Sequence, residues 1–276
     1  NTVAPPWRAS VDRGRKASPS ARCHGSGGAS LAKRVTTVTF QDRKQAGEKI
    51  TVLTAYDYPT ALAVDQAGID SILVGDSLGM VIQGHESTLP VTVDDMVYHT
   101  ANVMRVSRHA MVIADMPFMS HGTHEQALNT AGRLMKEGGA HMVKIEGGAP
   151  QIDTVHHLTA RAVPVCGHLG LLPQSIHQLG GYRVQGRDRE QADQLVEDAL
   201  ALERAGVYSL VLEGIPQEVA QEISEALDVP TIGIGAGPHC DGQVLVIYDL
   251  LGMDEKGLRG VRGNKITMIF QEAMRI

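Results

Sequence analysis

Asp76, Asp115 and Glu146 each end a short apolar run, and the three runs follow one another along the chain. A short apolar run without polar alternation predicts a strand buried on both faces. Carboxylate oxygens suit Mg²⁺, which takes one or two carboxylates together with water and substrate oxygens. If the strands are neighbours, the sequence predicts a magnesium site at Asp76, Asp115 and Glu146. The alternative is that the two aspartates cap loops and that Glu146 pairs with Lys144.

Lys144 precedes Glu146 by two positions, so strand alternation places both side chains on the same side. A lysine here could form a Schiff base or could clamp an anionic substrate. The clamp is favoured, because a metal ion and nearby acids keep the ammonium group charged and therefore a poor nucleophile.

Glu213 also ends an apolar run, and a carboxylate in such a setting is a candidate general base. A salt bridge to Arg183 or Arg187 is the alternative. His168 could donate to a substrate oxygen, orient Glu213, or serve only as a structural hydrogen-bonding residue. A divalent metal, an anion clamp and a separate base together indicate enolate chemistry on a 2-oxo acid.

The elements that must position these residues alternate between strands and helices. Strands are predicted at residues 50–56, 71–74, 111–115, 141–145, 162–167, 208–213 and 231–234, while 243–248 is either a strand or a helix. Such alternation predicts a parallel sheet, either closed or doubly wound. We favour a (β/α)8 TIM barrel, because polar residues end nearly every strand, whereas an open sheet would gather them at one switch point.

Composition is consistent with one α/β domain. The chain has 276 residues, 43% of them hydrophobic and 4% aromatic, with a net charge of −6, which argues against nucleic acid as the main partner. Its cysteines, Cys23, Cys166 and Cys240, lack zinc or disulfide spacing and favour a reducing compartment. No apolar run is long enough to predict a membrane span.

Three regions are expected. Residues 1–35 are basic and rich in Ser, Ala, Pro and Gly, which predicts a disordered extension, with organelle targeting as a weaker interpretation. Residues 36–253 form the catalytic barrel, and 254–276 form a divergent tail. The polar loops at 75–91 and 169–189 are candidate lids.

Two pairs of nearby histidines lie away from the predicted strand ends. The pairs His121/His124 and His156/His157 are interpreted as surface residues. They are therefore left out of the predicted site.

A series of short motifs in order resembles the ketopantoate hydroxymethyltransferase family. The motifs are residues 54–57 (TAYD), 74–80 (VGDSLGM), 83–85 (QGH), 89–92 (LPVT), 114–118 (ADMPF), 142–148 (MVKIEGG), 164–171 (PVCGHLGL), 180–182 (GGY), 184–187 (VQGR), 212–213 (LE) and 232–237 (IGIGAG). The resemblance covers about residues 36–253.

This resemblance implies a barrel of the phosphoenolpyruvate mutase/isocitrate lyase type. It implies transfer of a hydroxymethyl group from 5,10-methylenetetrahydrofolate to 3-methyl-2-oxobutanoate, giving 2-dehydropantoate for pantothenate synthesis, through an enolate stabilised by Mg²⁺. Asp76, Asp115 and Glu146 match the magnesium sphere; Asp76, Ser77, Asp115 and Lys144 match the oxoacid contacts; and Glu213 matches the proton acceptor. The family is typically cytoplasmic and decameric, so a homo-oligomer is expected.

The chain departs from the family pattern after residue 253, so the barrel could be incomplete at its C-terminal helix. Two alternatives stay open, the second of which is motivated by this departure. One is a C–C lyase of the same superfold acting on another 2-oxo acid, and the other is an inactive homologue.

Overall fold

The computed structural model describes residues 33–252, so residues 1–32 of the extension predicted for 1–35, and the tail predicted for 254–276, lie outside the described residues. Eight parallel strands close into a barrel in sequence order, with β1 paired to both β2 and β8. This confirms the predicted (β/α)8 fold. The strands are β1 Ile50–Thr54, β2 Ser71–Val74, β3 Met111–Asp115, β4 Met142–Glu146, β5 Val165–Gly170, β6 Ser209–Glu213, β7 Thr231–Ile234 and β8 Gly242–Leu245.

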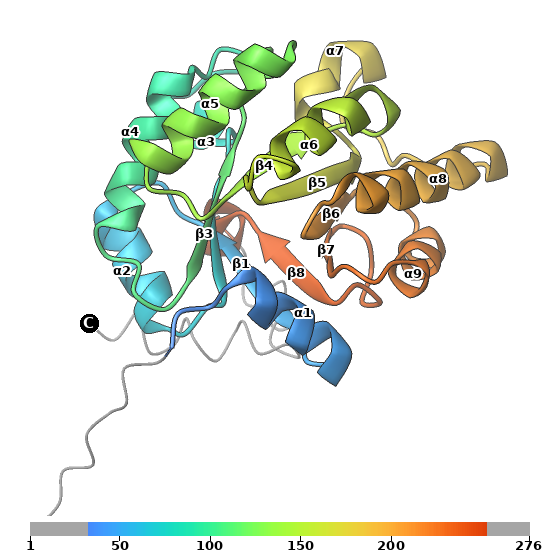
Figure 1. Ribbon diagram of the computed structural model, residues 1–276, viewed down its shortest axis with the longest axis horizontal. Helices are drawn as coiled ribbons and strands as arrows, with labels where there is room; N and C mark the ends of the chain where they lie inside the picture. Colours follow the sequence, from blue (N-terminus) through green and yellow to red (C-terminus); the bar gives the residue numbers. More distant parts are fainter. Residues whose placement is uncertain (1–32, 253–276) are drawn as a thin grey trace, which may run out of the picture. The chain divides into compact units, whose positions relative to one another are not determined.

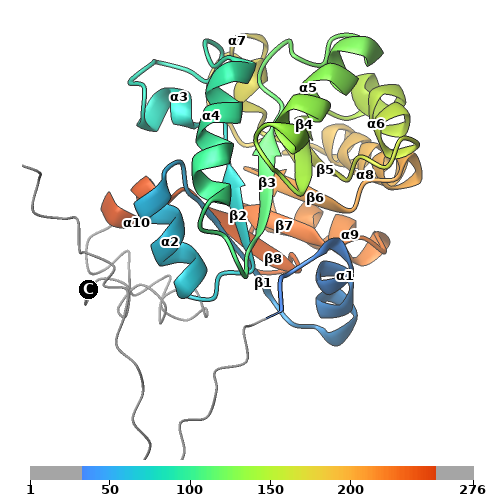
Figure 2. The same ribbon diagram turned by 60° about the vertical axis from the view of Figure 1, so that its left-hand side comes forward.

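Helices cover the outside of the strands (Figure 1). They are α1 Thr37–Ala46, α2 Tyr58–Gln66, α3 Leu78–Val81, α4 Val93–Met104, α5 His124–Lys136, α6 Ile152–Thr159, α7 Ile176–Leu179, α8 Arg189–Ala205, α9 Gln217–Ala226 and α10 Ile247–Gly252, with short 3₁₀ turns η1 Ala149–Gln151 and η2 Pro173–Ser175. The short helices α3 and α7 lie at one end of the barrel and α1 lies at the other (Figure 2).

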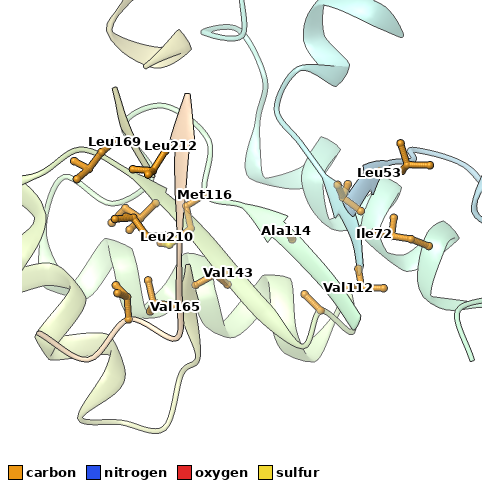
Figure 3. Packing of buried hydrophobic residues seen from close by; sticks show 14 of the residues in the cluster. Leu53, Ile72, Val112, Ala114, Met116, Val143, Val165, Leu169, Leu210 and Leu212 are labelled. Carbon is orange, nitrogen blue, oxygen red and sulfur yellow. The ribbon is translucent and has the colours of Figure 1, made fainter. Parts of the chain in front are cut away.

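Strands β1 to β4 are buried on both faces because their side chains alternate between two layers, whereas one face of β8 is half-buried. Outward residues such as Ile72, Val112 and Leu210 pack against the helices (Figure 3). Inward residues such as Ile113 and Val211 fill the barrel interior, where Phe40 of α1 joins them from below. Burying each of these side chains contributes about 1.5–3 kcal/mol, so most of the stability is concentrated in these two layers.

The N-terminal end of the barrel is closed by the first described residues. The Arg34 guanidinium donates to the carbonyl of Ser107 at 2.8 Å, and the backbone of Val35 donates to that of His109. Helix α1 begins with a capping box at Thr36 and Thr39. Within residues 33–252, no helix combines the length and the apolar character needed to cross a bilayer.

Three local predictions need correction. β5 begins at residue 165 and not at 162, because Ala162 adopts a left-handed turn with φ of 62° and the strand can start only beyond Pro164. Residues 243–248 contain both predicted alternatives, because β8 ends at Leu245 and α10 begins at Ile247. The loop predicted at 75–91 contains one helical turn, α3, since residues 78–81 include enough apolar side chains to bury one side.

Candidate active site

The inward side chains change from apolar to charged along several strands. In β3 the order is Met111, Ile113, Asp115, and in β4 it is Met142 followed by Lys144 and Glu146. β5 and β6 continue the pattern, with His168 and Glu213 at their inner C-terminal ends. Every second side chain of these strands points into the barrel, so the last inward side chain of each strand places its reactive group at the same end of the barrel.

A cavity of about 90 Å³ lies at this end. Its polar lining includes all seven residues singled out from the sequence, which are Asp76, Ser77, Asp115, Lys144, Glu146, His168 and Glu213. Its remaining lining is Thr54, Leu73, Pro173, Val211, Ile234, Val244 and Val246. The cavity is thus a small chamber with an apolar floor and a charged rim.

Lys144 is the central cation of this rim. Its Nζ lies 2.8 Å from Asp115 Oδ1 and 3.9 Å from Glu146 Oε1, with about 5% of the side chain exposed. Although burial opposes the charge, Asp115, Glu146 and Asp76 raise the pKa of Lys144 well above its usual range. The lysine is therefore permanently charged, which fits an anion clamp and not a Schiff-base nucleophile.

His168 bridges two carboxylates. Its Nδ1 lies 3.5 Å from Glu146 Oε1 and its Nε2 lies 3.2 Å from Glu213 Oε2. Burial and Lys144 oppose protonation of this ring, but Glu146 and Glu213 outweigh them and raise the pKa of His168 to about 9. An imidazolium between two acids orients both of them, and no salt bridge joins Glu213 to Arg183 or Arg187 in the described chain.

Asp76 and Ser77 enter from the end of β2. Asp115 Oδ2 accepts the backbone N–H of Asp76 at 3.0 Å, and Tyr56 Oη lies 2.8 Å from Ser77 Oγ. Burial, together with the charges of Asp115 and Glu146, raises the pKa of Asp76 well above its usual value. This end of the barrel therefore holds more negative charge than its buried cations neutralise.

Sequence reasoning missed two further residues at the site. Gln174, on η2, is buried and donates from its side chain to Asp76 Oδ2 at 2.8 Å and from its backbone to Glu146 Oε2 at 3.0 Å. Its only sequence signal is a position shortly after β5, within the predicted lid. Tyr182 of the same loop donates to Met80 Sδ of α3 at 3.3 Å, so the two predicted lids touch each other.

The prediction that His121 is a surface residue is wrong. Only 7% of it is exposed, because the segment after β3 folds inward before α5 begins. Burial lowers the pKa of His121, with Glu146 and Lys144 acting in opposite directions. His124 and His156 are exposed as predicted, and the ring of His124 stacks on that of His157 with centroids 4.5 Å apart.

Gly170, the last residue of β5, allows the main chain to pass very close to the end of β6. Gly170 has φ of 96°, and a Cβ atom there would collide with the backbone carbonyl of Glu213. The N–H of Leu171 donates to that same carbonyl at 2.7 Å. A glycine at position 170 therefore lets the chain fix the main chain that carries Glu213.

Comparison with known proteins decides the family. A family model described as ketopantoate hydroxymethyltransferase matches residues 34–267. The chain belongs to this family. A protein named 3-methyl-2-oxobutanoate hydroxymethyltransferase from Halorhodospira halophila is 57% identical over 241 residues, covering 87% of this chain and 86% of the relative. One of the same name from Geobacter sulfurreducens is 58% identical over 222 residues, covering 80% and 83%.

Solved structures share the fold of this family member at much lower identity. A 2,3-dimethylmalate lyase of the PEP mutase/isocitrate lyase superfamily matches with a TM-score of 0.58 and 17% identity, over 87% of this chain and 96% of the lyase. A phosphonopyruvate hydrolase in complex with oxalate and Mg²⁺ matches with a TM-score of 0.60 and 12% identity, over 83% and 85%. These likenesses confirm the predicted barrel type.

The donor set of this hydroxymethyltransferase fits a magnesium ion held largely by water. Within residues 33–252, no group of three His, Cys, Asp or Glu side chains is arranged to hold one ion jointly. Asp115 Oδ1 has the Lys144 ammonium group at 2.8 Å as its partner, and Asp115 Oδ2 accepts the backbone N–H of Asp76 at 3.0 Å. Two neighbouring aspartates that line the cavity, Asp76 and Asp115, suit an ion that needs only one or two carboxylates. Direct binding by all three predicted acids stays a prediction.

Proposed function

We propose that this protein transfers a hydroxymethyl group from 5,10-methylenetetrahydrofolate to 3-methyl-2-oxobutanoate in a Mg²⁺-dependent reaction that gives 2-dehydropantoate, the first step of pantothenate biosynthesis. The main support for this proposal is that all seven predicted residues line one cavity, in a chain that is 57% identical to a protein named 3-methyl-2-oxobutanoate hydroxymethyltransferase.

The size and lining of the cavity support a small branched 2-oxo acid as substrate. A volume of about 90 Å³ is on the order of six to nine water-sized groups, which suits a molecule with fewer than ten non-hydrogen atoms. The apolar floor, which includes Val211 and Val244, suits a branched alkyl group. The charged rim suits a carboxylate and a keto oxygen, with Lys144 as the cationic partner of the carboxylate.

Asp76 and Asp115 would hold the magnesium ion, with Glu146 near enough to act through water. When bound, the ion would polarise the keto oxygen and stabilise negative charge that develops there. The phosphonopyruvate hydrolase solved in complex with oxalate and Mg²⁺ shares this fold, which supports a metal ion and a small acid as ligands of such a barrel.

Glu213 would remove the proton from C3 of the oxoacid. It lies on β6 in the lining of the cavity with 23% of its side chain exposed, so it is in contact with both the chamber and solvent. His168 holds the Glu213 carboxylate in place, and the charged rim favours the enolate that proton removal creates. Water would break the two C–N bonds of the donor's methylene carbon, which releases tetrahydrofolate and leaves that carbon at the level of formaldehyde. The enolate carbon would then form the new C–C bond to it, and the resulting alkoxide would take up the proton that Glu213 removed from C3.

The test separates proton removal from carbon transfer. With Mg²⁺ and 3-methyl-2-oxobutanoate in deuterium oxide, the wild-type protein should exchange the C3 proton without any folate, as followed by proton NMR. Glu213→Gln should lower this exchange by on the order of 10³-fold, since the base is gone while the shape is kept. Folded wild-type protein that exchanges no C3 proton would rule out the proposed reaction.

A C–C lyase acting on another 2-oxo acid is the second candidate, favoured only by the fold shared with 2,3-dimethylmalate lyase. A lyase needs no folate, whereas the proposed transferase forms product only when the donor is present. Product formation with and without 5,10-methylenetetrahydrofolate therefore distinguishes the two. The homo-oligomer expected from the resemblance stays a prediction.

A further inference from the structure

Gln174 occupies the space between the acids of two different strands. Its side-chain nitrogen donates to Asp76 Oδ2 at 2.8 Å and to the carbonyl oxygen of Met116 at 3.0 Å, while its backbone N–H donates to Glu146 Oε2 at 3.0 Å. The residue is 7% exposed. We propose that Gln174 is a positioning residue of the active site, which fixes the Asp76 carboxylate and ties the segment after β5 to the ends of β2, β3 and β4.

The amide group suits this position better than any other polar side chain of similar length. A glutamine NH₂ has two N–H donors, and here both have an acceptor, so the side chain has one orientation. Lysine or arginine would satisfy the same oxygens but would also cancel the negative charge that a metal ion or a cationic group needs. Gln174 holds one oxygen of Asp76 and leaves the charge of the site unchanged.

Two independent attachments make the role of Gln174 separable from folding. The side chain alone fixes Asp76, whereas the contact with Glu146 uses the main chain. A substitution that keeps the side-chain volume should therefore release Asp76 and leave Glu146 in place. A purely structural role would instead predict that both contacts survive together or are lost together.

The test compares Gln174→Met and Gln174→Glu with matched changes at Gln178, an exposed residue of α7 in the same loop. Methionine keeps the length and removes both donors, and glutamate turns a donor into an acceptor facing two acceptors. We expect C3 exchange to fall by on the order of 10²-fold in both Gln174 variants, because small misplacements of reacting groups cost about that much. Gln178→Met and Gln178→Glu should match the wild type.

Two readouts do not depend on turnover. Mn²⁺ binding followed by electron paramagnetic resonance should weaken by on the order of tenfold in Gln174→Met, and a crystal structure of this variant should show Asp76 in a new rotamer with Glu146 unmoved. An unmoved Asp76, or exchange that falls only in proportion to the unfolded fraction in thermal denaturation, would overturn the proposal.

The exchange assay rests on the proposed function, so the crystal structure separates the two failures. If the wild type exchanges no proton, the proposed function fails, and the Asp76 rotamer in Gln174→Met still decides the role of Gln174. If the wild type exchanges and Gln174→Met keeps both its rate and its Asp76 rotamer, only the positioning role fails.

Discussion

At the N-terminal end of the barrel, Asp70 and Asp241 each have a cation of their own, whereas at the C-terminal end Asp115 and Glu146 share Lys144. Asp70 accepts from the backbone and hydroxyl of Thr51 and pairs with Arg43 at 2.7 Å. Asp241 repeats this arrangement, pairing with Lys44 at 2.8 Å and accepting from Thr231 at 2.8 Å. The first set of acids is satisfied within the fold.

The C-terminal end shows the reverse condition. Asp115 and Glu146 lie 2.8 and 3.9 Å from the same ammonium group, that of Lys144, and their charges raise the pKa of the neighbouring Asp76. Crowded carboxylates are costly unless something compensates them. Carboxylates therefore stabilise the N-terminal end of the barrel, whereas at the C-terminal end their mutual repulsion is only partly compensated. A cationic ligand is accordingly expected at the C-terminal end.

The largest expected effect separates activity from stability at the C-terminal end. Asp76→Asn should lower C3 exchange by on the order of 10³-fold, because it removes a charged group that would hold the ion and the substrate. Without metal, the same variant should be as stable as the wild type or more stable by about 1 kcal/mol, since burial and its acidic neighbours already disfavour the charge. Urea unfolding in chelator, paired with the exchange assay, measures both quantities.

The matched change at the other end should give the opposite result. Asp70→Asn keeps the shape but loses either the Arg43 ion pair or one threonine donor, which costs about 2–3 kcal/mol in unfolding free energy. Its exchange rate should equal that of the wild type at temperatures where it is folded. Equal stability losses for Asp70→Asn and Asp76→Asn would remove the distinction between the two ends.

Most of the site can be predicted from the sequence because the residue pattern that marks a barrel strand is local. The first and last residues of β3 and β7 are the predicted ones, and every predicted site residue lines the cavity. An apolar run that stops on a charged residue reports both the burial of a strand and the point at which it leaves the barrel. That information needs no knowledge of distant contacts.

What the sequence could not predict depends on those distant contacts. Gln174 has no acid–base chemistry of its own, and its role exists only because η2 folds back onto strands far away in the chain. His121 reads as polar surface because nothing in its neighbourhood indicates that the segment after β3 turns inward. The start of β5 was misplaced because residues 162–164 are apolar enough for a strand, and only the positive φ of Ala162 excludes it.

Two histidines extend the comparison to pH. At the N-terminal end, burial and Arg34 lower the pKa of His141 to about 4. Its contribution to stability should be complete above about pH 6.5 and should be lost as the pH falls toward 4. His168 has its pKa raised to about 9, so its contribution should be complete below about pH 6.5 and lost as the pH rises through 9.

Urea unfolding of the wild type, His141→Gln and His168→Gln between pH 4 and 10 checks these opposite slopes. For His168, which is 2% exposed, the change should be on the order of 3 kcal/mol. For the partly exposed His141, solvent screening reduces it to about 1–2 kcal/mol. Each substitution should remove its histidine's contribution to the pH dependence of the unfolding free energy. If the two substitutions changed that dependence in the same direction, the opposite charge states inferred for His141 and His168 would be wrong.

The smallest expected effect concerns Tyr56, which orders a hydroxyl at the crowded end without carrying charge. Burial raises the pKa of Tyr56 to about 12, so the phenol stays protonated and can donate to Ser77 Oγ at 2.8 Å. Tyr56→Phe removes one neutral hydrogen bond, worth about 1 kcal/mol, and should lower kcat/KM for the oxoacid about fivefold. Tyr98→Phe, at a residue 65% exposed on α4, is the matched control and should change nothing. A loss as large as that of Asp76→Asn would mean that Tyr56 contacts the reacting atoms itself, whereas no loss would mean that Ser77 needs no partner to present its hydroxyl to the substrate.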